Sequence, residues 1–177
     1  MWFNHPMVAN RFPIMLFDWG DTVMYDDPAQ TTPMILWPEV RAVPCIDRVL
    51  AYLQASGRRI ILGTSANIST VAQIRGALAR VGLDAFFERI YCFENTQLPK
   101  SEAFYRHLLA DLQIEPSATL MVGDHLEKDV LTPNRLGMYA LWFNERSEEK
   151  YASELAATVH SMDELWSFFE GMDHIQA

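Results

Sequence analysis

Short runs of large apolar residues alternate along this chain with segments in which apolar residues recur at helical spacing. The runs predict strands at 14–17, 59–63, 89–93, 119–123 and 140–144. Helical spacing is found between and after them, at 46–53, 71–81, 104–112 and 165–169. Alternation of this kind is typical of βαβ units, so the pattern predicts an α/β domain with mainly parallel strands.

Residues that favour helix ends lie where these helices should begin and stop. Gly57 and Gly82 are predicted to end the first two helices. The predicted N-terminal signals are Ser69, Ser101, Thr132 with Pro133, and the capping-box pair Ser161 and Glu164. No repeat or linker interrupts the series, so we expect a single domain over 1–177 with its core at about 12–170.

Residues 23–44 depart from the alternation. Apolar residues there lack helical spacing, and prolines recur at Pro28, Pro33, Pro38 and Pro44. Proline lacks a backbone donor and interrupts helices, so we expect an irregular flap at about 23–44.

Polar residues follow three of the predicted strands at the point where each strand ends. Asp18 follows the run 14–17, Asp124 follows the run 119–123, and Thr64 follows the run 59–63. The carboxyl ends of parallel strands meet at one edge of the sheet, where such domains bind ligands. Carboxylates brought together there repel unless a cation lies between them, and Mg²⁺ prefers such oxygen ligands. The alternative is that these aspartates only form turns.

The order of Asp18-Trp19-Gly20-Asp21-Thr22, Thr64, Lys100 and the segment 123–129 resembles the haloacid dehalogenase-like hydrolase superfamily. The similarity runs from residue 14 to about 144. It implies a Rossmann-like three-layer sandwich with a mainly parallel sheet, an aspartyl-phosphate intermediate and a required Mg²⁺. Many members insert a cap domain between motifs. Here a helix and a strand use about half of the interval 23–63, which leaves too little for a helical cap, and a helix and a strand fill the interval 65–99. We therefore expect a capless or minimally capped member with no separate cap domain.

The resemblance also assigns roles by position. Asp18 is the expected nucleophile. Asp18 is also an expected metal ligand, as are the Gly20 carbonyl and Asp124. Asp129 is expected to be a metal ligand or an orienting group behind Asp124. Thr64 would hold a phosphate oxygen, with Ser65 as its alternative, and Lys100 would neutralise the phosphoryl charge. Lys100 as a solvated lysine and Asp129 as a helix-start residue remain the alternatives.

One position departs from the family pattern. Most phosphatases of this superfamily carry an acid/base aspartate two residues after the nucleophile, where this chain has Gly20. Either Asp21 takes over that function or turnover is slow, since general acid/base groups typically raise the reaction rate by 10²–10⁴-fold. Asp26 and Asp27 are expected to be surface charges.

Three functions follow from these residues. The first is an Mg²⁺-dependent phosphomonoester hydrolase. The second is a dehalogenase-like or phosphonatase-like hydrolase. The acidic pair Asp124 and Asp129 argues against a dehalogenase, and the absence of a lysine before Lys100 argues against a phosphonatase. The third is a non-catalytic domain that binds a phosphorylated ligand or a protein, which Gly20 keeps open.

Composition restricts the partners. The formal charge of −9 argues against nucleic acid, which needs clustered Lys and Arg, and against anionic membranes. Cys45 and Cys92 are too few for a disulfide framework, and no signal-peptide pattern is evident, so we expect a cytoplasmic protein. A capless site suggests a bulky phosphorylated substrate or closure by a second subunit in a homo-oligomer; a small substrate under the flap residue Trp37 is the alternative.

Overall fold

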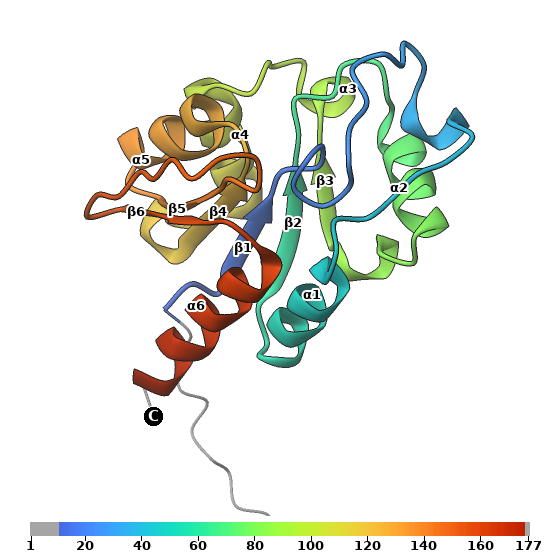
Figure 1. Cartoon of the computed structure of the whole chain (residues 1–177). Helices are drawn as coiled ribbons and strands as arrows, with labels where there is room; N and C mark the ends of the chain where they lie inside the picture. Colours follow the sequence, from blue (N-terminus) through green and yellow to red (C-terminus); the bar gives the residue numbers. More distant parts are fainter. Residues whose placement is uncertain (1–10, 176–177) are drawn as a thin grey trace, which may run out of the picture.

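The computed structural model describes residues 11–175. Its centre is a six-stranded sheet in the order β3-β2-β1-β4-β5-β6, and every pair of neighbouring strands is parallel (Figure 1). The strands are β1 (Ile14–Phe17), β2 (Arg59–Gly63), β3 (Arg89–Tyr91), β4 (Thr119–Gly123), β5 (Tyr139–Phe143) and β6 (Ala156–Val159). The α-helices are α1 (Ile46–Ala55), α2 (Val71–Arg80), α3 (Phe93–Thr96), α4 (Glu102–Leu112), α5 (Thr132–Arg135) and α6 (Met162–Ile175). Shorter turns are η1 (Met34–Leu36), η2 (Asp84–Phe86), η3 (Pro116–Ala118) and the π-helical η4 (Leu126–Leu131).

Helices cover both faces of the sheet. Successive side chains of a strand point to opposite faces, so Met15 and Phe17 of β1 pack with α1, α2 and α6. Ile14 and Leu16 pack on the other face, with α4. All four side chains of β1 are buried, as a central parallel strand covered on both sides requires. The predicted three-layer α/β fold is confirmed.

Several element ends differ from the prediction. Thr70, not Ser69, caps α2, because its hydroxyl accepts from the Gln73 N–H while the Gln73 side chain accepts from the Thr70 N–H. The third strand stops at Tyr91, because Cys92 is the N-cap of α3, which begins at Phe93. Ser101 is at the N-cap of α4 without a capping hydrogen bond.

Two further differences concern the C-terminal half. Thr132 is the first residue of α5 and not its cap, since η4 runs directly into that helix. Strand β6 was not predicted; its two middle residues are only half-buried, so it lacks the apolar run of the central strands.

The flap is irregular, as predicted, with η1 as its helical turn within the part of the chain the structure describes. Its two ends are tied together, because the Tyr25 N–H donates to the Arg41 carbonyl and Met24 bridges Ala42. The Arg80 guanidinium of α2 donates to the carbonyls of Ile35, Trp37 and Pro38 at 3.0, 2.6 and 3.0 Å. These contacts fix the flap beside the carboxyl edge of the sheet. The single-domain boundaries stay a prediction.

No helix among residues 11–175 combines the length and the apolar character needed to cross a membrane.

Candidate active site

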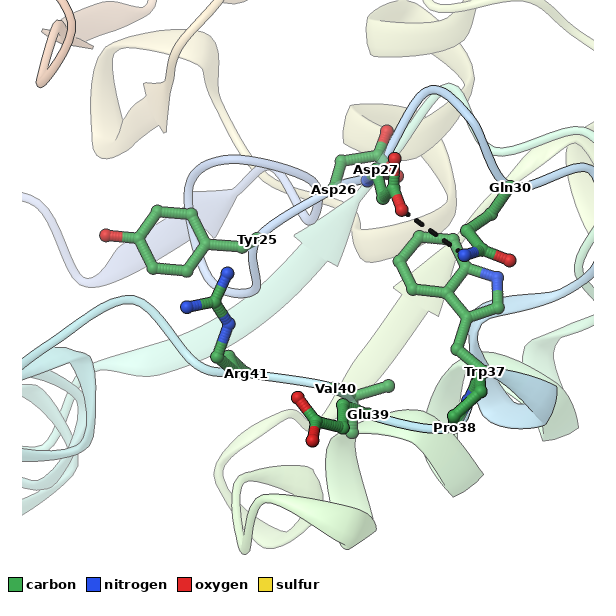
Figure 2. A pocket seen from close by; sticks show the side chains of 9 residues that line it. All are labelled: Tyr25, Asp26, Asp27, Gln30, Trp37, Pro38, Glu39, Val40 and Arg41. Carbon is green, nitrogen blue, oxygen red and sulfur yellow. Dashed lines mark hydrogen bonds between the residues drawn. The ribbon is translucent and has the colours of Figure 1, made fainter.

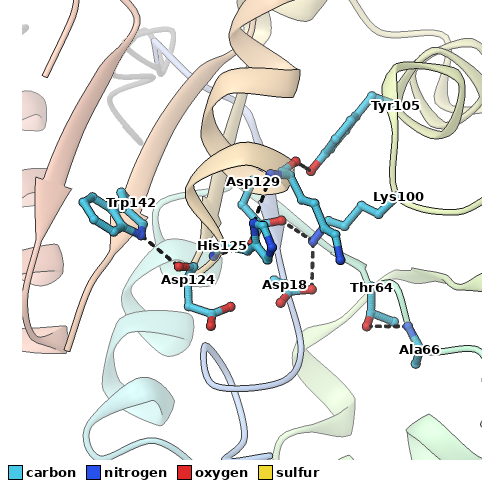
Figure 3. A network of polar contacts seen from close by, with 10 residues as sticks. Asp18, Thr64, Ala66, Lys100, Tyr105, Asp124, His125, Asp129 and Trp142 are labelled. Carbon is cyan, nitrogen blue, oxygen red and sulfur yellow. Dashed lines mark hydrogen bonds and ion pairs between the residues drawn. The ribbon is translucent and has the colours of Figure 1, made fainter. Parts of the chain in front are cut away.

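Three chain segments meet at the carboxyl ends of neighbouring strands. The register pairs Phe17 of β1 with Leu62 of β2 and with Val122 of β4, so the residues that follow these strands become neighbours. Figure 3 shows Asp18, Asp124 and Thr64 at this edge, with Lys100 and Asp129 beside Asp18. The structure therefore brings together the side chains that the sequence singled out from four separate segments.

Lys100 is the cation of this cluster. Its side chain is only 1% exposed, and its Nζ lies 2.8 Å from Asp18 Oδ1 and 2.6 Å from Asp129 Oδ1. Burial disfavours the ammonium form, but the two carboxylates outweigh burial and raise the pKa of Lys100. Lys100 is therefore a fixed positive charge against the predicted nucleophile, and the solvated alternative does not describe its position.

The position of the Asp129 side chain depends on the backbone before η4 and on the end of β4. Its Oδ2 accepts from the His125 N–H at 3.0 Å, and its side chain is 1% exposed. A Cβ atom on Gly123 would overlap the Asp129 carboxyl group, so glycine at the end of β4 makes room for it. Asp129 thus faces Lys100 inside the site, unlike a helix-start residue that only meets solvent.

Asp124 and Asp18 are carboxyls whose charged form the site disfavours. Burial first, and then Asp18 and Asp129, raise the pKa of Asp124 to about 7. Burial likewise raises the pKa of Asp18 to about 6, although Lys100 opposes the shift. Trp142 of β5 donates from its indole N–H to the Asp124 carbonyl at 2.8 Å and fixes the backbone there.

The three carboxyls form a set that suits a divalent cation. One oxygen from each of Asp18, Asp124 and Asp129 lies within 4.8 Å of the others. Lys100 supplies one positive charge against three carboxyl groups, and burial raises the pKa of Asp18 and of Asp124, so a further cation would stabilise their charged forms. Hard oxygen donors with excess negative charge are what Mg²⁺ binds, so the residues present fit that ion.

Two cavities adjoin Asp18. One of about 260 Å³ is bordered by the flap residues Met34 and Trp37 and by the loop Thr64–Ser69. The other, of about 150 Å³, is lined by Lys100, Asp124 and Asp129. Ser65 lines both, whereas Thr64 lines only the larger one. Thr64 Oγ1 accepts from the Ala66 N–H at 3.1 Å, which leaves its own hydrogen available to an acceptor.

Asp21 borders the smaller cavity together with Asp18, but both oxygens of its carboxyl group already have partners. Its Oδ2 lies 2.7 Å from the Arg146 guanidinium, and its Oδ1 accepts from the Asp26 N–H at 3.2 Å. Asp26, expected as a surface charge, is exposed but lines both cavities together with Asp18 and Gly20. The spacing of residues in the sequence could not predict that Asp26 lies beside Asp18 and Gly20, because a turn in the loop after β1 brings it to this position.

Comparison with known proteins agrees with this geometry. Residues 16–137 match the sequence profile of the haloacid dehalogenase-like hydrolase family. A ribulose-1,5-bisphosphate 5-phosphatase from Halopiger xanaduensis is 31% identical over 134 residues, covering 72% of this chain and 55% of that protein. A glyceraldehyde 3-phosphate phosphatase from Pyrococcus abyssi is 33% identical over 106 residues, covering 59% and 43%. The chain thus spans about half the length of these curated relatives.

A solved structure shares nearly the whole fold. An uncharacterised protein from Listeria monocytogenes superposes with a TM-score of 0.77 at 19% identity, covering 91% of this chain and 98% of that one. At this identity the likeness concerns the fold alone.

Proposed function

This chain belongs to the haloacid dehalogenase-like hydrolases, and on that premise we propose that it is an Mg²⁺-dependent phosphomonoester hydrolase. The observation that carries the proposal is the buried Lys100, which lies 2.8 Å from Asp18 in a cluster of three carboxyls. The phosphatase names of the two curated relatives point to the same bond.

In this proposal the Asp18 carboxylate attacks the phosphorus and forms an aspartyl phosphate, which water then cleaves. Lys100 orients Asp18 through Oδ1 and offsets the negative charge of the phosphoryl group. The free hydrogen of the Thr64 hydroxyl, or that of Ser65, would bind a phosphate oxygen. These groups are preorganised by burial and by backbone contacts, so little reorganisation is needed during reaction.

Asp18, Asp124 and the Gly20 carbonyl are the proposed Mg²⁺ ligands, with Asp129 as ligand or as the group that orients Lys100. When bound, the ion would supply Lewis-acid stabilisation of the charged phosphoryl oxygens.

The cavities favour a small phosphorylated substrate. Each cavity is smaller than the roughly 300–1,000 Å³ of typical small-molecule sites, and their combined volume lies near the lower end of that range. Trp37, buried and hydrogen bonded through its indole N–H to the Thr32 carbonyl at 2.8 Å, forms a rigid wall beside Asp18. We therefore propose a small organic phosphate in place of a bulky one. Cytoplasmic location and homo-oligomerisation stay predictions.

The test is a panel of small phosphomonoesters, assayed with Mg²⁺ and with EDTA. Phosphate release that EDTA stops and Mg²⁺ restores is the expected result. A 2-haloacid is assayed in parallel, and halide release from it in EDTA would instead support a dehalogenase. Tight binding of a phosphorylated ligand without phosphate release would support the non-catalytic alternative.

A further inference from the structure

The loop after β1 turns back on itself and brings Asp26 against Gly20. Asp21 adopts a left-handed backbone with φ of 52°, and its N–H donates to the Met24 carbonyl at 2.7 Å. Met24 forms a β-bridge with Gly20, and Asp21 Oδ1 accepts from the Asp26 N–H. Short polar residues tolerate the left-handed region best, so Asp21 builds the turn that positions Asp26.

Asp26 fills the space that a side chain at position 20 would enter. A Cβ atom placed on Gly20 would lie 3.3 Å from Asp26 Cβ and 3.4 Å from Asp26 Oδ2. A side chain at position 20 would therefore be in tight contact with Asp26, which would have to shift by a few tenths of an ångström. The glycine at position 20 leaves the Asp26 carboxyl group room beside the backbone of the strand-end loop.

The Asp26 carboxyl group is anchored at one oxygen and open at the other. Oδ1 accepts from the Asp27 N–H at 2.9 Å, while Oδ2 accepts no hydrogen bond from the described residues 11–175. Asp26 borders both cavities beside Asp18 and also the flap pocket shown in Figure 2, where Asp27 turns to Gln30 instead. An open carboxyl oxygen beside the nucleophile can exchange a proton with a bound molecule.

We propose, on the basis of the phosphatase function above, that Asp26 is the general acid and base of this site. In the first step the Asp18 oxygen bonds to phosphorus, the bond to the alcohol oxygen breaks, and the Asp26 carboxyl gives that oxygen its proton. In the second step the Asp26 carboxylate takes a proton from the attacking water, and the bond from phosphorus to Asp18 breaks. The products are the alcohol, inorganic phosphate and the original enzyme.

The test compares Asp26→Asn with Asp27→Asn on glycerol phosphate and on p-nitrophenyl phosphate. General acid catalysis matters most for an alkoxide, so Asp26→Asn should lower kcat on glycerol phosphate by roughly 10²-fold or more. The loss on p-nitrophenyl phosphate should be smaller, because nitrophenolate leaves without a proton. With that substrate, aspartyl phosphate should accumulate in acid-quenched Asp26→Asn, because water attack then lacks its base. Asp27→Asn, a neighbouring carboxyl that only shapes the flap, should behave as wild type.

A double variant guards against a purely structural explanation. Gly20 is not among the described glycines with positive φ, so its backbone accepts a side chain, and Asp26→Ala removes the carboxyl group that lies beside it while keeping the Cβ atom. The double variant Gly20→Asp with Asp26→Ala should be at least about tenfold more active than Asp26→Ala alone. This expected gain is smaller than the typical general acid/base contribution of 10²–10⁴-fold.

Two results would overturn the inference. An active wild type whose Asp26→Asn variant keeps its rate on both substrates overturns the role of Asp26 alone. A wild type that forms no phosphoenzyme overturns the proposed function, and the role of Asp26 with it.

Discussion

Single residues set the charge balance of this site, and Asp124 shows it most clearly. Its pKa is raised from 3.8 to about 7, chiefly by burial and then by Asp18 and Asp129. Between these two values the folded protein holds a proton that the unfolded chain has lost, so the stability of the metal-free protein falls as pH rises.

Asp124→Asn removes this titration. In EDTA the variant should gain stability relative to wild type, with a larger gain at pH 8 than at pH 5, because the penalty is complete only above the folded-state pKa. Urea unfolding at the two pH values measures the difference. With Mg²⁺ the order should reverse, since the variant lacks a ligand carboxylate. An equal effect at both pH values would contradict the account.

At the level of elements, α2 controls the flap through one side chain. Arg80 donates to the carbonyls of Ile35, Trp37 and Pro38 and so holds the wall of the larger cavity. Lysine has a single ammonium group and cannot reproduce the planar fork of arginine.

Arg80→Lys should therefore loosen the flap while the sheet stays intact. Hydrogen exchange should accelerate in residues 32–40, and KM for a small phosphate should rise several-fold with a smaller change in kcat. Arg106→Lys is the matched control, because Arg106 is exposed and lies 3.7 Å from Glu102, its neighbour on α4. Unchanged exchange in the flap of Arg80→Lys would show that these hydrogen bonds do not hold it.

The elements also show what a sequence can and cannot predict. The central strands were predictable because burial on both faces requires continuous apolar runs, and strand ends place Asp18 and Asp124 at one edge. The cap of α2 was not, because Ser69 and Thr70 are both good caps and Gln73 selects between them. Asp26 was hidden because its place depends on the left-handed turn at Asp21 and on hydrogen bonds within the loop.

Across the whole molecule, the parallel sheet brings Asp18 and Lys100 together, and we propose that Asp18 is thereby set up to be phosphorylated. Lys100 lies far along the chain from Asp18, and only the packing of α4 against the sheet places its Nζ at 2.8 Å. The claim can be tested without knowing the natural substrate, because a reactive phosphate donor suffices to form an acyl phosphate.

The most direct measurement is to mix the protein with Mg²⁺ and acetyl phosphate, quench in acid and map the phosphate by mass spectrometry. We expect phosphate on Asp18 in the wild type and none in Asp18→Asn, and phosphatase turnover of that variant should fall by several orders of magnitude. Far-ultraviolet circular dichroism would confirm that Asp18→Asn is folded. A folded Asp18→Asn protein that still turns over phosphomonoesters with Mg²⁺ would contradict the account.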